Sequence, residues 1–141
     1  MKAKAKAPAA AKSGAKIQDR VKSWEEAYPI FLKKKFKDPL FLILQKRKKN
    51  ELTSHEKQMI FAEVLRNGWV ANFNDGSQQK WFCIFYYKGG KAGFVLSHSY
   101  TYYVHTNTTV GSRLSFPTEE LAEHFGNNSL DLQNDYLIIK Q

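Results

Sequence analysis

Residues 80–87, with the sequence KWFCIFYY, constrain the fold more than any other segment of the chain. Aromatic and β-branched side chains favour strands, and this run is rich in them. The sequence KGGK at residues 88–91 is typical of a tight hairpin turn, and residues 92–96 are suited to return as the partner strand. The run therefore predicts an antiparallel β-hairpin on which the rest of the chain must pack.

More strands are expected around this hairpin. A turn signal, Asn74-Asp75-Gly76, precedes it. Residues 100–105 again combine β-branched and aromatic side chains, and residues 113–116 form a shorter candidate strand. We therefore expect an antiparallel β-meander of three or four strands.

The clearest helix is predicted before the sheet, over residues 55–66. Thr53 and Glu56 have the spacing of a capping box, and Asn67-Gly68 supplies a left-handed stop after the helix. One broad face of this helix is apolar, formed by Met59, Ile60, Val64 and Leu65.

The first ordered helix has two candidate starts. Ile17, Val21 and Trp24 fall on one helical face, whereas Ser23 and Glu26 form a capping box that would start the helix at Trp24. An interior proline costs about 3 kcal/mol, so Pro29 predicts a kink and a second piece that runs into residues 33–35. Pro39 then suits the first position of a short helix over residues 40–48.

Two helices are expected after the sheet. Thr118 caps the first, acidic residues occupy its first turn, and Gly126 ends it. The second covers residues 129–136, with Leu130, Tyr136 and Leu137 turned inward. The predicted fold class is therefore α+β, with N-terminal helices, the meander and C-terminal helices in one domain over residues 17–141.

Residues 1–16 differ from this domain in composition. The segment MKAKAKAPAAAKSGAK contains five lysines and no acid, and its only apolar side chains larger than Ala are Met1 and Pro8. Such a segment cannot offset its own ordering entropy, so we expect a disordered basic tail.

The net charge of +9 is distributed unevenly. Residues 1–50 carry +11, and residues 51–141 carry −2. This asymmetry predicts an anionic partner that meets one end of the molecule, and nucleic acid is favoured without sequence specificity. The predicted nucleic-acid-binding residues are Lys2, Lys4, Lys6, Lys12, Lys16, Lys33, Lys34, Lys35, Lys46, Arg47, Lys48, Lys49, Lys88 and Lys91, with Lys37 beside them.

Aromatic residues of the meander are a second, weaker signal for this partner. They could stack on unpaired bases, and they could equally form the core of a sheet that packs under helices. The residues concerned are Trp81, Tyr86, Tyr87, Tyr100, Tyr102 and Tyr103.

No residue pattern predicts catalysis or a bound metal. The four histidines and Cys83 show no helical i, i+4 pair and no Cys-x-x-Cys spacing. Cys83 lies in an aromatic strand, where a thiol packs as a small apolar group with a raised pKa. Ser97-His98-Ser99 would place Ser and His on opposite faces of a strand. We expect neither an enzyme nor a cofactor.

Two other patterns have structural explanations. Residues 89–93, GGKAG, lack the following Ser or Thr and the following helix of a phosphate-binding loop. The acidic pairs Glu25-Glu26 and Glu119-Glu120 lie at predicted helix starts, which the helix dipole favours. No apolar run approaches the ~20 residues of a membrane span, and the basic N-terminus lacks the apolar stretch of a secretory signal. With a single cysteine, a reducing cytoplasmic setting is expected.

Several short segments resemble a family of small proteins from Bacteroidetes bacteria, their prophages and their phages, including crAss-like phages. The matching segments are NGW (67–69), NFN (72–74), QKWF (79–82), VGSRLSF (110–116), EELA (119–122), LDL (130–132) and DYL (135–137). The resemblance covers roughly residues 54–138 and omits the tail. It implies a phage or prophage product that acts in the bacterial host cytoplasm or in the virion, and it carries no catalytic residue. Arg113 within VGSRLSF is expected to brace a loop or a carboxylate.

Two functions follow from these expectations. The first is a non-enzymatic, phage-encoded protein that associates with nucleic acid through its basic N-terminal third. The alternative is a virion structural or assembly component, associated with a capsid or tail, whose basic tail contacts other virion proteins or the packaged genome.

Overall fold

The computed structural model describes residues 16–102 and 110–139. The predicted basic tail therefore lies outside the described residues except for Lys16, and so do residues 103–105 of the predicted third strand.

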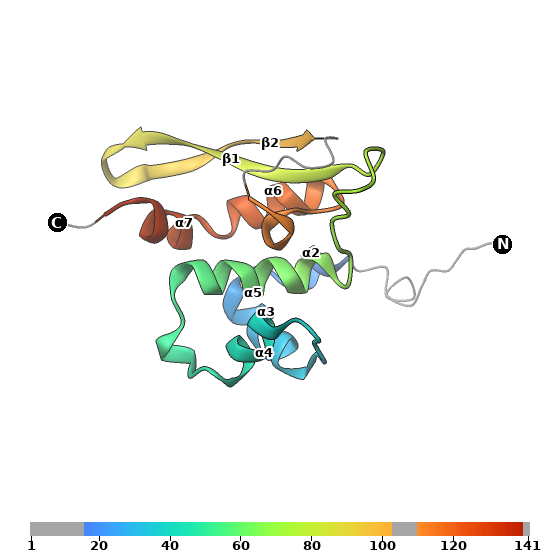
Figure 1. Ribbon diagram of the computed structural model, residues 1–141. Helices are drawn as coiled ribbons and strands as arrows, with labels where there is room; N and C mark the ends of the chain where they lie inside the picture. Colours follow the sequence, from blue (N-terminus) through green and yellow to red (C-terminus); the bar gives the residue numbers. More distant parts are fainter. Residues whose placement is uncertain (1–15, 103–109, 140–141) are drawn as a thin grey trace.

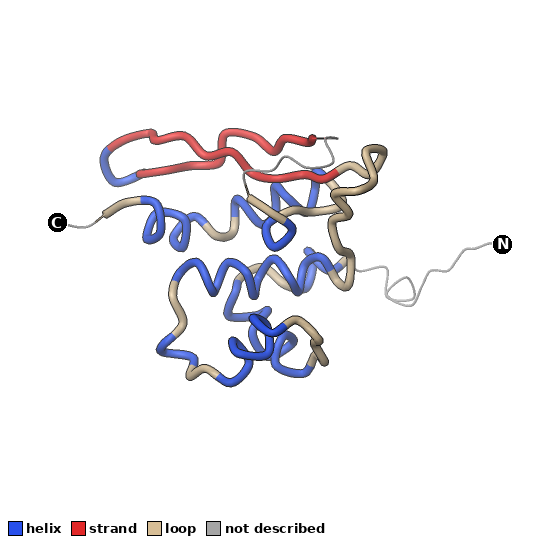
Figure 2. Tube along the Cα trace, in the orientation of Figure 1, coloured by secondary structure: helices blue, strands red, loops and turns tan. Residues whose placement is uncertain are grey.

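The hairpin and the helices are stacked on one another (Figures 1 and 2). The hairpin lies over α6 and α7, the long helix α5 runs beneath these two helices, and α3 and α4 lie on the far side of α5. The helices are α2 (Ile17–Arg20), α3 (Trp24–Lys33), α4 (Pro39–Lys46), α5 (Ser54–Arg66), α6 (Glu119–Asn127) and α7 (Leu130–Leu137). The strands are β1 (Lys80–Gly89) and β2 (Gly93–Tyr102), and short 3-10 turns are η2 (Lys49–Glu51), η3 (Gly90–Ala92) and η4 (Ser112–Leu114).

Both candidate starts of the first helix are used, because the helical conformation is interrupted between them. α2 ends at Arg20, and Ser23 then caps α3 by accepting a hydrogen bond from the Glu26 backbone N–H at 3.1 Å. Pro29 lies inside α3, so the predicted division at this proline is wrong. An exposed proline that removes one backbone donor is tolerated here because Trp24, Ala27 and Phe31 anchor the helix in the core.

Helix α5 forms the centre of the core, as its apolar face predicts. The capping box of Thr53 and Glu56 is formed in both directions, and Asn67 ends the helix in the left-handed conformation with φ of 49°. Side chains from both sides pack on this helix in one continuous cluster. Its members include Val21, Trp24, Phe31, Phe41, Leu44, Ile60, Phe61, Val64, Leu65, Phe116, Ala122, Phe125 and Leu132.

The predicted hairpin is confirmed, but the described sheet has two strands and not three or four. Residues 100–102 continue β2 and pair with β1, where Tyr102 lies opposite Lys80. A bulge allows this, because Ile84 pairs with His98 and the next residue, Phe85, pairs with Leu96. Ser97 is the extra residue that the bulge accommodates.

The predicted fourth strand at residues 113–116 is also wrong. Its first half is the 3-10 turn η4, which follows Gly111 with φ of 70°. Only Phe116 joins the sheet among the described residues, through a two-bond antiparallel bridge to Trp81 in which both N···O distances are 2.8 Å. The predicted α+β class is confirmed, with a two-stranded sheet in the described residues.

The C-terminal helices form, with two corrections. Thr118 caps α6 as predicted, but α6 continues through Gly126 to Asn127. Gly126 is needed for close packing, because a Cβ atom there would lie 2.9 Å from both Cys83 Sγ and Leu96 Cδ1. In α7, the buried residues are Leu132 and Gln133, while the side chains of Tyr136 and Leu137 are 55% and 41% exposed.

Candidate functional site

Eight basic residues from the α3–α4–η2 region form the strongest candidate site. We call this set the basic surface: Lys33, Lys34, Lys35, Lys37, Lys46, Arg47, Lys48 and Lys49. They come from two segments, the end of α3 with the following loop and the end of α4 with η2. Both segments belong to the part of the molecule on the far side of α5 from the hairpin (Figure 1).

Gln45 ties these two segments together. Its side-chain Nε2 donates to the carbonyl oxygens of Phe31 at 2.9 Å and of Lys34 at 2.8 Å. The Phe31 carbonyl also accepts from the Lys34 backbone N–H at 3.2 Å, whereas Lys34 is the C-cap of α3 and no further helical turn follows it. One amide on α4 thus ties the end of α3 to the end of α4. Gln45 is the single uncharged polar residue of the helix PLFLILQK, and this was the available sequence signal.

The charges of the basic surface are left largely uncompensated. Within residues 16–102 and 110–139, its seven lysines form no ion pair, and only Arg47 is paired, to Glu56. By contrast, α6 and α7 on the other side of α5 carry five acidic residues and no Lys or Arg. This separation of charge orients the molecule in the field of a polyanion.

Aromatic rings hold one edge of the basic surface. The Lys49 ammonium lies 5.6 Å from the Trp24 ring centroid and 5.5 Å from that of Tyr28, and Lys57 lies 4.9 Å from Trp24. Cation–π contacts of this kind position an ammonium group without neutralising its charge. Lys57 of α5 was not among the predicted residues, because a lone lysine in a helix gives no sequence signal.

The other predicted nucleic-acid-binding residues do not lie with the basic surface. Lys88 and Lys91 are exposed near the tip of the hairpin, on the opposite side of α5 (Figure 1). Lys16 forms an exposed ion pair with Glu120 at 3.3 Å. Lys2, Lys4, Lys6 and Lys12 fall outside the described residues.

The aromatic residues of the hairpin divide between the core and the surface. Trp81 packs against the core cluster, so it is not a stacking platform. Tyr86 and Tyr87 are 49% and 58% exposed and precede Lys88 directly. The side chains of Tyr100 and Tyr102, and all of Tyr103, are outside the described parts.

Cys83 is a packed thiol with a raised pKa, as its strand position predicts. Its Sγ–H donates to the carbonyl oxygen of Ala122 at 2.8 Å, and burial raises the pKa of this thiol to about 12. A thiol with this pKa is almost entirely protonated at neutral pH and is therefore a poor nucleophile.

The prediction that Ser97 and His98 face apart is wrong. The bulge at Ser97 interrupts the alternation of the strand, and Ser97 Oγ lies 2.8 Å from His98 Nδ1. Both residues are exposed. The pair therefore lies outside the buried environment in which a catalytic triad orients its histidine.

The remaining polar candidates have structural roles. Glu26 accepts from the Lys22 backbone N–H at 2.7 Å, and Glu119 and Glu120 occupy the first turn of α6. His124 is within 2.7 Å of the Val21 carbonyl oxygen. In the part of the chain that the structure describes, no cluster of three or more His, Cys, Asp or Glu side chains is suited to a metal ion.

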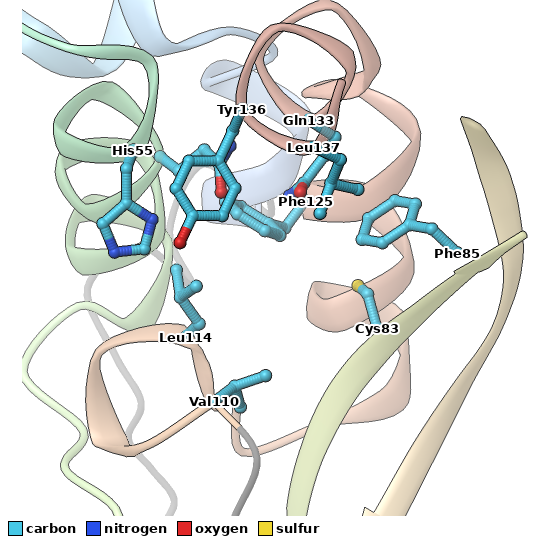
Figure 3. Close-up of a pocket in the computed structure, with 10 residues that line it drawn as sticks. His55, Cys83, Phe85, Val110, Leu114, Phe125, Gln133, Tyr136 and Leu137 are labelled. Carbon is cyan, nitrogen blue, oxygen red and sulfur yellow. The ribbon is translucent and has the colours of Figure 1, made fainter. Parts of the chain in front are cut away.

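A cavity of about 440 Å³ lies between α5, α7, the hairpin and the segment before η4 (Figure 3). Its walls are mostly apolar, and its polar lining comes from His55, Gln58, Gln133 and Tyr136. The His55 and Tyr136 rings are stacked, with 4.8 Å between their centroids and 22° between their planes. No sequence pattern indicated this cavity, because its walls come from five separate segments.

Comparison with protein-family models, curated proteins and solved structures finds no match to this chain. The resemblance to small phage proteins is therefore still a prediction. Of the helices in the described residues, none has the length and the apolar character that crossing a membrane requires.

Proposed function

We propose that this chain is a non-enzymatic, phage- or prophage-encoded protein that binds nucleic acid without sequence specificity through its basic N-terminal third. The observation that carries the proposal is the basic surface, in which seven lysines lack acidic partners among the described residues and lie opposite the acidic helices α6 and α7. Lysines without acidic partners can neutralise phosphates of a nucleic acid and so release its condensed counterions. The five lysines of residues 1–16 add charge to the same end of the sequence.

Phosphate contacts account for the proposed binding better than base stacking does. The exposed Tyr86 and Tyr87 belong to the hairpin, away from the basic surface, and Trp81 is packed in the core. Contacts of lysine ammonium groups with phosphates carry no sequence information. The expected binding is therefore salt-dependent and similar for different sequences.

The salt dependence of binding tests this proposal. The full chain is titrated with a fluorescein-labelled 20-base-pair duplex by anisotropy at several KCl concentrations. The variant Lys33→Gln/Lys34→Gln/Lys35→Gln is expected to lose affinity and to lower the slope of log K against log[KCl] by about 2–3, because each lost phosphate contact removes about 0.9. The variant Lys46→Gln/Lys48→Gln/Lys49→Gln should behave alike.

Lys88→Gln/Lys91→Gln is the matched control, since it removes charge from the hairpin tip alone. Per lysine removed, this variant should lower the slope by less than each triple variant. If the change per lysine is the same in the control and in the triple variants, net charge and not the basic surface determines binding. An unchanged slope in both triple variants would refute the proposal.

The alternative proposal, a virion structural or assembly component, has support from a different feature. Tyr136, Leu137, Ile138 and Ile139 form an exposed apolar run, in which Ile139 is 85% exposed. Consecutive exposed apolar side chains favour a protein partner. Mass spectrometry of purified phage particles separates the two proposals, because a virion component must be present at a fixed stoichiometry.

A further inference from the structure

We propose that the cavity between α5, α7 and the hairpin is a binding site for an uncharged, largely apolar or aromatic small molecule that carries a carbonyl or amide group. The site is separate from the basic surface and independent of the nucleic-acid proposal. Its volume of about 440 Å³ falls within the usual range of small-molecule pockets. The cavity also combines apolar walls with a few convergent polar groups, as such pockets do.

Two buried glutamines give the cavity its polarity. Gln58 of α5 is 1% exposed and Gln133 of α7 is 5% exposed, and both line the cavity. The Nε2 atom of Gln58 is buried and has no hydrogen-bond partner among the described residues, and the same holds for Nδ1 of His55. Buried amides are normally hydrogen-bonded, so an unpartnered one at a cavity wall requires an explanation.

A bound carbonyl group would supply the missing partner. A side-chain amide both donates and accepts, so Gln58 and Gln133 together could pair with the two edges of a ligand amide. The apolar body of the ligand would lie against Phe85, Phe125 and Leu114, which come from the hairpin, α6 and η4 (Figure 3).

The lining of the cavity also selects against a charged ligand. No Asp, Glu, Lys or Arg is among the lining residues of the described structure. The thiol of Cys83 is uncharged as well, because burial raises its pKa to about 12. An ionised group would therefore enter without an Asp, Glu, Lys or Arg as its counter-charge, which is unfavourable in a largely apolar environment.

The rim of the cavity is aromatic and partly open. Tyr136 is 55% exposed, and its ring stacks on His55 beside the cavity (Figure 3). Leu137, the next residue, is 41% exposed and also lines the cavity. Exposed side chains change rotamer rapidly, so these two residues can move as a ligand enters.

The test uses three related probes with the full ¹⁵N-labelled chain: benzamide, toluene and benzoate. Benzamide is expected to cause saturable amide shifts confined to the cavity residues, with a dissociation constant on the order of 1 mM. Toluene lacks the carbonyl group and should bind several-fold more weakly. Benzoate has the same shape as benzamide but carries a charge, and it should cause no saturable shifts at the cavity.

Two variants connect this binding to the cavity. Leu137→Trp fills the cavity from its rim and should abolish the benzamide shifts, whereas Ile139→Trp adds the same side chain at an exposed position outside the lining and should not. Gln58→Leu should weaken benzamide about tenfold and leave toluene unchanged. Because this replacement removes a buried amide whose Nε2 has no partner among the described residues, the variant should stay folded.

The proposal is overturned if benzamide gives no saturable shifts, or if Leu137→Trp leaves them intact. If benzoate binds as tightly as benzamide, the inference that the ligand is uncharged is overturned. Equal binding of toluene and benzamide, with no effect of Gln58→Leu, would overturn the role of the amide.

Discussion

Arg113 and Asp38, 75 positions apart in the sequence, form a two-point ion pair in which Nη1 and Nη2 donate to Oδ2 and Oδ1, each at 2.9 Å. Asp38 also caps α4, because its Oδ2 accepts from the Phe41 backbone N–H at 3.0 Å. The Arg113 guanidinium lies 4.7 Å from the Phe41 ring centroid, and its backbone carbonyl accepts from buried Arg66. This group of contacts joins α4, α5 and η4, and it bears out the bracing role expected for Arg113.

Replacing Arg113 with Lys should lower the free energy of unfolding by about 1 kcal/mol. Lysine keeps the charge but cannot make the two parallel hydrogen bonds, and the partly exposed pair limits the loss. Arg47→Lys is the matched control, because Arg47 contacts Glu56 through Nη1 alone. Urea unfolding of both variants measures the difference, and equal losses would show that the two-point geometry of Arg113 contributes nothing.

The ion pair should also make stability depend on pH in the acid range. The hydrogen bonds from Arg113 lower the pKa of Asp38 below its ordinary value of 3.8. A lowered folded-state pKa gives stability that is fully present above the unfolded-state pKa and is lost as the pH falls through the folded-state pKa. The stability difference between the wild type and Asp38→Asn should therefore be constant from pH 7 to about pH 5 and shrink below about pH 4. Urea titrations at each pH measure it, and a difference that grows toward low pH would contradict the assignment.

Gly126→Ala should destabilise the protein by about 1–2 kcal/mol, although alanine is the better helix former. The added methyl group would meet Cys83 Sγ and Leu96 Cδ1, each 2.9 Å from the Cβ position. The double variant Gly126→Ala/Cys83→Ala should recover part of this loss, because one of the two contacts is removed. Asn127→Ala, one residue further in α6 and exposed, serves as the control and should change stability little. Strict additivity of the Gly126 and Cys83 changes would mean that the contact with the hairpin is not limiting.

Cys83 should react slowly with thiol reagents in the folded protein. Its pKa of about 12 leaves a thiolate fraction at pH 8 on the order of 10³-fold smaller than that of an ordinary cysteine. Iodoacetamide labelling followed by mass spectrometry should therefore be negligible in buffer and complete in 8 M urea. Rapid labelling in buffer would show that the contact between the hairpin and α6 opens frequently.

Local sequence signals predicted the parts of the fold that depend on neighbouring residues. The caps at Ser23, Thr53 and Thr118 and the hairpin turn all form, because each needs only residues three or four positions away or a turn of defined length. The basic clusters were likewise visible in the sequence, although the structure alone places two of them together.

The errors arose where distant contacts decide the structure. Two expected strands form the single strand β2, which contains the bulge at Ser97. Residues 112–114 form a turn and not a strand, and Arg113 in this turn donates to Asp38. The spacing of apolar residues in α7 did not identify buried Gln133, and it turned Tyr136 and Leu137 inward, which line the cavity but are 55% and 41% exposed. A polar residue on an inner face cannot be distinguished from an exposed one by periodicity.

Gln45 connects the two basic segments of the basic surface through its side-chain amide. Its Nε2 donates to two carbonyl oxygens, so the stability of variants should follow their capacity to donate: Gln, then Lys, then Ala, then Glu. Gln45→Ala should cost about 1–2 kcal/mol for the two lost hydrogen bonds. Gln45→Glu should cost more, because a carboxylate would face the carbonyls of Phe31 and Lys34 without a hydrogen to donate. Urea unfolding of the three variants gives the order directly. If Gln45→Glu is as stable as Gln45→Lys, the amide does not hold the two segments together, and the basic surface must owe its arrangement to the apolar contacts of α3 and α4 alone.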